Sequence, residues 1–167
     1  HDVDARVFLI TDSTTLADAV EKAMNEQIST LSTRSIAEQS LSHSCCIIVS
    51  DMTHGIRISN SIAPEHLAVQ VQFPDQITPH LKHYGALFIG KYAAEVFGDY
   101  GVGPNHVLPT GMAARFTGGL SVLHFSRMRT FMHSNMPIDE LCISDAVSLA
   151  RLEGLDAHAY AAQIRKN

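Results

Sequence analysis

Long apolar runs, clusters of basic residues and a secretory leader are all missing from this sequence of 167 residues. No apolar stretch approaches the roughly 20 residues that cross a bilayer, so we expect no membrane partner. Lys and Arg total 12 against 17 Asp and Glu and form no run, which argues against a nucleic-acid partner. The opening "HDVDARVFLI" lacks the basic segment and apolar run of a signal peptide. These absences predict a cytoplasmic protein.

Cysteine is scarce and is not spaced for metal binding. Cys45 and Cys46 are adjacent in an apolar run, and Cys142 lies far along the chain. No pair has the two to four intervening residues of a zinc-binding motif. We expect free, buried thiols.

A Gly-rich phosphate loop is also missing, because no G-x-G-x-x-G follows any predicted strand. If a dinucleotide binds, its contacts are not visible in this sequence. With 46% hydrophobic and 17% charged residues, the chain is nevertheless typical of a globular protein.

Short apolar runs alternate with helical patterns, which favours an α/β fold with a parallel sheet. A helix should follow Ser13 or Thr14, either of which can cap it, and another should end before Pro64. A short helix is expected in "DQITPHLKHYG", and a helical tail after Pro137, interrupted at Gly154 and capped again by Asp156. The predicted parallel strands are 6–10, 45–49, 67–72 and 86–90.

The stretch "GDYGVGPNHVLPTG", residues 98–111, is too rich in glycine and proline for a helix or a central strand. It follows the predicted strand 86–90, and ligands bind open α/β sheets at the carboxyl ends of strands. Asp99 is a suitable zinc ligand. The alternative is a turn-rich loop in which Asp99 and Asn105 cap backbone groups.

Two further places hold groups capable of chemistry. Glu65 and His66 in "APEHL" pair a carboxylate with an imidazole that titrates near neutral pH, although a solvated Glu beside a packed His is the alternative. In the tail, Glu153 and His158 flank a glycine, but His158 alone is more typical of a helix surface. His1 alone is compatible with a tag remnant.

The chain resembles the histidinol dehydrogenase family in four stretches whose order and spacing fit across nearly its whole length. The long Gly/Pro/Asn/His loop and "PEHL" make this resemblance specific. The stretches are "SNSIAPEHLAV", "GALFIG", "GDYGVGPNHVLPTGMAARFTGGLSVLHF" and "LEGLDAHAYAAQIR".

The resemblance implies oxidation of L-histidinol to L-histidine in two NAD-dependent steps, by a zinc-dependent, cytoplasmic homodimer. It implies that Glu65 and His66 are the catalytic pair, with His66 accepting protons and Glu65 activating water. By the same resemblance, zinc is held by His1, Asp99 and His158. The substrate site implied by the family consists of His1, His66, Asp99, His106, Glu153 and His158.

Family members are much longer than this chain. The resemblance therefore implies that residues 1–120 are the C-terminal half of an incomplete Rossmann-like α/β domain. Residues 121–167 form a helical tail exchanged with a partner subunit. The residues that contact NAD are expected outside this chain, and the chain alone is expected to be inactive. Two alternatives are a free-standing zinc-dependent hydrolase with Glu65 as base, and a non-catalytic α/β interaction module.

Overall fold

The computed structural model describes residues 2–166 and separates into two compact units. The first unit extends to Phe125 and the second begins at Ser126. Each is described by itself below. No helix in the described part of the chain is long and apolar enough to cross a membrane.

Four short strands form two parallel pairs in the first unit, and the predicted strands are confirmed to within about three residues at each end. The described residues form two separate two-stranded sheets rather than the single sheet expected from the sequence. Phe8 lies opposite Cys45 in the first pair, and His66 lies opposite Ala86 in the second. The strands are β1 (Phe8–Thr11), β2 (Cys45–Ile48), β3 (His66–Val69) and β4 (Ala86–Ile89).

Three helices accompany the strands: α1 (Thr14–Ile28), α2 (Arg34–Ser42) and α3 (Met52–Ile62). The predicted start of α1 is confirmed, since the Ser13 hydroxyl accepts a hydrogen bond from the Leu16 amide at 3.2 Å. Helix α2 was not predicted.

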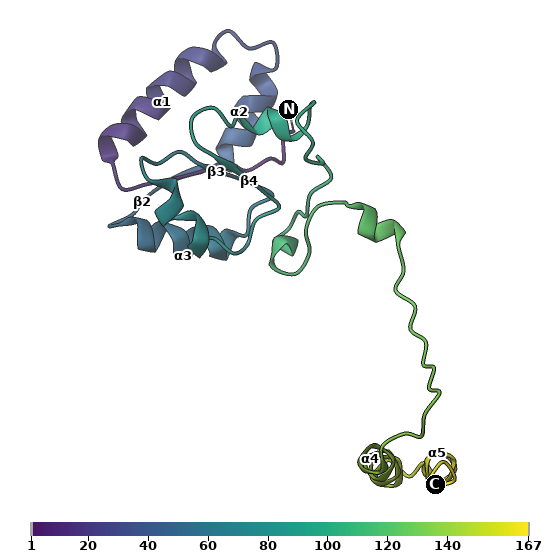
Figure 1. The fold of residues 1–167 in the computed structure, drawn as a ribbon. Coiled ribbons are helices and arrows are strands. Elements are labelled where there is room, and N and C mark those ends of the chain that lie inside the picture. The colour runs from purple at the N-terminus through teal and green to yellow at the C-terminus, as the bar shows by residue number, and fades with distance from the viewer. Residues whose placement is uncertain (1, 167) are drawn as a thin grey trace. The chain divides into compact units, whose positions relative to one another are not determined.

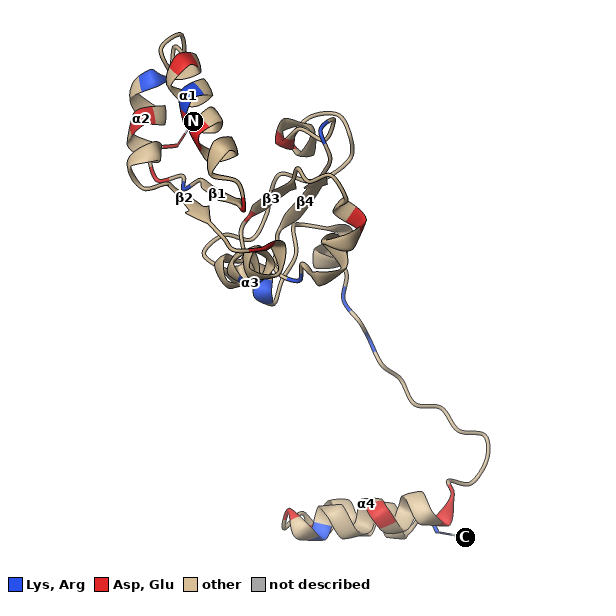
Figure 2. Ribbon diagram, turned by 90° about the vertical axis from the view of Figure 1, so that its left-hand side faces the viewer, with Lys and Arg blue, Asp and Glu red and all other residues tan. Residues whose placement is uncertain are grey.

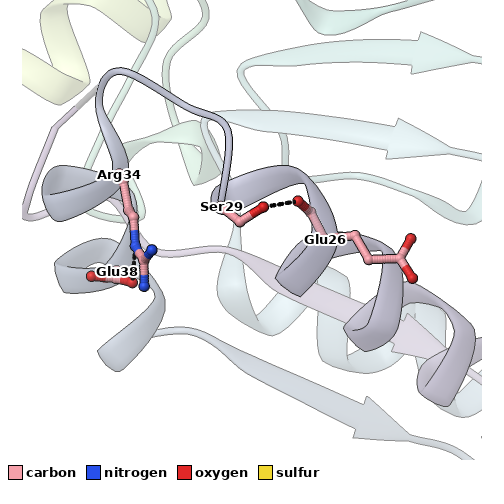
Figure 3. Close-up of polar contacts among 4 residues, drawn as sticks. All are labelled: Glu26, Ser29, Arg34 and Glu38. Carbon is pink, nitrogen blue, oxygen red and sulfur yellow. Dashed lines mark hydrogen bonds and ion pairs between the residues drawn. The ribbon is translucent and has the colours of Figure 1, made fainter.

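Local polar contacts shape the corner between α1 and α2 (Figure 3). The Ser29 hydroxyl donates to the Glu26 carbonyl at 2.6 Å at the end of α1. The Arg34 guanidinium lies 2.7 Å from the Glu38 carboxylate one turn along α2. Both ion-pair partners are half exposed, so the pair supports the helix only weakly.

Helices α1 and α3 lie on opposite sides of the first strand pair (Figures 1 and 2). On α3, a Cβ added to Gly55 would lie 3.3 Å from the Ile10 side chain and 3.7 Å from Val49, so the helix packs closely on the strands. Val49 is buried, but Phe8 and Ile48 are exposed. Part of the apolar surface of this strand pair is therefore left uncovered.

The cysteines differ from the prediction in one respect. All three, Cys45, Cys46 and Cys142, are free, as expected, but all are exposed rather than buried. The apolar run around Cys45 does form β2. Within that strand Ile47 is half-buried, and the other three residues are exposed. An apolar strand is buried only where other elements cover both faces of its sheet.

The prediction of one short helix ended by a glycine in "DQITPHLKHYG" is wrong. Two short 3-10 turns, Pro74–Gln76 and Thr78–His80, take its place. Pro79 has no amide hydrogen to donate and disfavours the α conformation at the residue before it. Gly85 does not end a helix, and it directly precedes β4.

The second unit contains α4 (Glu140–Leu152) and α5 (Asp156–Gln163), which confirms the helical tail. The Asp139 carboxylate caps α4 by accepting from the Leu141 amide at 2.8 Å, so the helix begins at Glu140, three residues after Pro137. Gly154 separates the helices with a φ of +74°, as expected of a helix-ending glycine. Asp156 is the first residue of α5 and not its cap.

Asp51 caps α3, the helix that leads into "APEHL", and this cap should be pH dependent. Its carboxylate accepts from the His54 amide at 2.8 Å, and this hydrogen bond lowers the pKa of Asp51 below its ordinary value of 3.8. A lowered folded-state pKa adds stability above the unfolded value and loses it as the pH falls through the folded one. Urea unfolding of Asp51→Asn should therefore show destabilisation at pH 7 that shrinks below pH 3.8.

Asp51→Ala is the matched comparison, because it removes the acceptor as well as the charge. It should be less stable than Asp51→Asn at every pH. A difference between Asp51→Asn and the parent that stays constant from pH 7 to pH 3 would contradict this description of the cap.

Candidate active site

The end of α3 turns sharply to deliver Glu65 and His66. Ala63 adopts a left-handed conformation with φ of 49°, is 2% exposed, and donates its amide hydrogen to the Ser59 carbonyl at 2.9 Å. Pro64 then directs the chain into β3, which begins at His66. Adjacent residues can serve one site only if a constrained turn presents them, and this turn supplies the constraint.

Backbone pairing with the start of β4 fixes the same segment. The Pro64 carbonyl accepts from the Gly85 amide at 2.9 Å, and the Glu65 carbonyl accepts from the Ala86 amide at 2.8 Å. The parallel ladder between the two strands therefore begins before His66. The backbone that carries the two candidate catalytic residues is held at the amino end of the second strand pair.

Gly85 allows the glycine-rich loop to approach this backbone. A Cβ at position 85 would lie 2.5 Å from the Glu65 carbonyl oxygen and 3.0 Å from Cδ of Pro109. Only a residue without a side chain fits between them. Glu65 of "APEHL" and Pro109 of "GPNHVLPTG" thus meet at one glycine although they are 44 positions apart in the sequence.

Further contacts fasten the loop. The Val107 carbonyl accepts from the Leu120 amide at 2.8 Å, and Arg115 donates to the Ser61 carbonyl at the end of α3 at 2.6 Å. The Asn105 side chain accepts from the Val107 amide at 2.8 Å, so Asn105 shapes the turn, as in the alternative expected from the sequence. His106 is exposed in this fastened loop.

His66 is the most closely surrounded of the candidate side chains. Its ring stacks on Phe88 with centroids 6.0 Å apart and planes inclined by 24°, and its side chain is 23% exposed. Nδ1 lies 3.6 Å from the carboxylate of Glu95. Sequence reasoning missed Glu95, because nothing in its local pattern distinguishes it from a solvated carboxylate.

Asp99 follows a turn that packs on the same aromatic ring. The turn is η3 (Glu95–Gly98), and a Cβ at Gly98 would lie 2.6 Å from Cζ of Phe88. Asp99 itself is exposed. The segment after β4 therefore brings Glu95 beside His66 at the amino end of β3 and packs Gly98 on the ring of Phe88. The expected ligand site at the carboxyl ends of the strands stays a prediction.

The expected zinc ligands do not all fall within one described unit. Residues 2–166 contain no cluster of three or more His, Cys, Asp or Glu side chains that could hold a metal ion. His1 lies outside the described residues. Glu153 and His158 are exposed and belong to the second unit, whereas Asp99 belongs to the first.

Comparison with known proteins decides the family. The family model described as histidinol dehydrogenase matches residues 1–166. The chain belongs to the histidinol dehydrogenase family. This match confirms the resemblance seen in the sequence. It agrees with the expectation that the chain corresponds to only part of a longer family sequence.

Curated relatives agree along the whole chain. Histidinol dehydrogenase of Rhodospirillum rubrum is 41% identical over 169 residues, covering 100% of this chain and 39% of the relative. The Bacillus subtilis enzyme is 40% identical, covering 99% and 39% respectively. A crystal structure of histidinol dehydrogenase from Elizabethkingia anophelis matches 99% of this chain with a TM-score of 0.89 at 30% identity. The chain spans about two-fifths of these relatives' length.

Gly85→Ala tests the close approach on which the site depends. The new Cβ meets a backbone oxygen that cannot move aside cheaply, so unfolding should be easier by about 1–3 kcal/mol. Gly118→Ala is the matched control, since a Cβ there meets no atom within 4 Å, and it should change stability by less than about 1 kcal/mol. Equal stability of the two variants in urea unfolding would contradict the contact between Gly85 and Glu65.

Proposed function

We propose that this chain is the part of a histidinol dehydrogenase that carries its acid–base residues, and that the enzyme oxidises L-histidinol to L-histidine with two NAD. The observation that supports this most strongly is family membership along the whole chain, together with the fixed placement of Glu65 and His66 beside the glycine-rich loop. The alternatives, a hydrolase or a non-catalytic module, lose support because the relatives are named as dehydrogenases.

His66 acts as the base in both oxidations. When the alcohol carbon loses hydride, the hydroxyl proton passes to the His66 ring and an aldehyde forms. Glu65 then takes a proton from water as the water oxygen bonds to the aldehyde carbon. His66 returns the proton that it took from the alcohol to the carbonyl oxygen, which completes the hydrate, and Glu65 releases its proton to solvent. His66 then accepts a hydroxyl proton again as the hydrate loses the second hydride and becomes the carboxylic acid. Partial burial of His66 suits a base that meets substrate directly.

The cofactors of this proposal are zinc and NAD. A carboxylate and two imidazoles have the donor chemistry of a zinc site, and His1, Asp99 and His158 would hold the metal. Bound zinc would orient the substrate and polarise its oxygen. NAD would accept hydride, and we assign no residue of this chain to it.

The tail and the loop complete the substrate site in this proposal. His106 and Glu153 would contact histidinol, with Glu153 and His158 donated by the partner subunit of a cytoplasmic homodimer. Exposed apolar side chains support this exchange: Met128 is 95% exposed and Phe131 is 91% exposed. Apolar surface of this extent on a soluble protein marks an interaction site.

The strand pairs belong, in the same proposal, to one Rossmann-like sheet completed by further chain. The support is the exposure of large apolar side chains on three of the four strands: Phe8 of β1, Ile48 of β2 and Ile89 of β4. Strands of a parallel sheet are ordinarily covered on both faces.

Two substitutions separate the proposed roles in the enzyme at the length of its relatives. His66→Asn should slow oxidation of both histidinol and the aldehyde, because each releases a proton as hydride leaves. Glu65→Gln should slow mainly the aldehyde step, which alone needs water. Losses of ~10²–10⁴-fold should appear in kcat more than in KM. The measurement is NADH formation from each substrate.

Aldehyde oxidation by Glu65→Gln at the parent rate would disprove the water-activating role. Failure of the parent enzyme to reduce NAD with histidinol would disprove the proposed function as a whole. The 167-residue chain alone serves as the negative control and should show no turnover.

A further inference from the structure

We propose that Glu95 is a positioning residue that keeps the proton of neutral His66 on Nδ1 and leaves Nε2 to accept a proton from the substrate. This inference rests on the proposed function for its catalytic meaning. The placement of Glu95 against His66 is independent of that function.

Geometry separates the two ring nitrogens of His66. Nδ1 lies 3.6 Å from Oε1 of Glu95, which is an ion-pair distance and longer than a hydrogen bond. The ring also stacks on Phe88, with 6.0 Å between the ring centroids, so it has neighbours on two sides. With Nδ1 facing a carboxylate, Nε2 on the other side of the ring is the nitrogen available to a ligand.

Glu95 belongs to a turn that packs on the same ring that stacks with His66. It begins η3, whose last residue, Gly98, packs so closely on Phe88 that a Cβ would lie 2.6 Å from Cζ. Within this turn the Asp99 amide donates to the Val96 carbonyl at 3.2 Å. Both the His66 ring and the turn that carries Glu95 therefore pack against Phe88.

Glu65 is not an equivalent partner for the His66 ring. Among the described residues the His66 ring forms its ion pair with Glu95 and forms none with Glu65. Glu95 comes instead from a separate segment that crosses the face on which His66 and Phe88 stack. The two carboxylates can thus have separate tasks, with Glu65 acting on water and Glu95 on the imidazole.

The chemistry requires such a partner. A histidine that accepts a proton through Nε2 must carry its other proton on Nδ1, and a carboxylate facing Nδ1 favours this tautomer and the cation that forms. The Glu95 side chain is 59% exposed, so the pair contributes little to folding stability. Its effect should therefore appear in the tautomer and in kcat, and not in unfolding.

The first test is the ¹⁵N spectrum of the imidazole rings of the 167-residue chain at a pH where His66 is neutral, with its signals assigned by their loss in His66→Asn. The parent should carry the proton on Nδ1. Glu95→Met keeps the side-chain length but removes the acceptor, and should shift the proton toward Nε2, the form favoured by imidazoles in water. Glu21→Met makes the same change on an exposed carboxylate of α1 and should leave the tautomer unchanged.

An Nε2–H tautomer in the parent, or an unchanged Nδ1–H tautomer in Glu95→Met, would overturn the proposal. This measurement needs neither substrate nor cofactor. It therefore decides the placement of Glu95 even if the enzyme proves to act on something other than histidinol.

The second test is kinetic, in the enzyme at the length of its relatives. Glu95→Met should lower kcat about tenfold, less than the ~10²–10⁴-fold contribution of an acid–base group itself, with KM nearly unchanged. Glu95→Asp should recover part of the loss, and Glu21→Met should match the parent. An unchanged kcat in Glu95→Met, or a loss confined to KM, would show that Glu95 does not act through His66.

Discussion

The candidate site depends on one stretch of backbone pairing, between the carbonyls of Pro64 and Glu65 and the amides of Gly85 and Ala86. This pairing starts the β3–β4 ladder and sets its register, with His66 opposite Ala86. If the register slipped by one residue, His66 would leave the face that carries Phe88. The stacking on Phe88, the approach of Glu95 and the packing of the loop all follow from this register.

Packing around the pairing depends on two glycines. Gly85 makes room for Pro109, and Gly98 makes room for the ring of Phe88. Two segments distant in sequence can then pass within van der Waals contact of the strand pair. Pro109 of the loop is thereby placed beside the backbone of Glu65.

The strands and most helices could be predicted from sequence because their signals are local. Apolar runs identify β1 to β4, and a left-handed Ala63 before Pro64 ends α3 where the proline rule requires. Helix α2 was missed because "RSIAEQSLS" has too few apolar residues for a clear period. The burial of Cys45 and Cys46 was wrongly predicted because burial depends on covering layers that these residues cannot report.

The site was predictable only in part. Glu65, His66 and the loop carry distinctive residues, whereas Glu95 gains its place from a turn that folds back over the strands, a long-range event with no local signature. The roles in substrate and zinc binding remain predictions for five residues, because these residues form one site only if separate units or subunits associate. The five are His1, Asp99, His106, Glu153 and His158.

Amide hydrogen exchange at Gly85 and Ala86 tests the central claim most directly. Their hydrogen bonds to Pro64 and Glu65, 2.9 and 2.8 Å long, join the strand that carries His66 to its neighbour. The account predicts that both amides exchange as slowly as the amides inside β4. Exchange at the rate of an unstructured peptide would show that Glu65 and His66 are not held by this pairing.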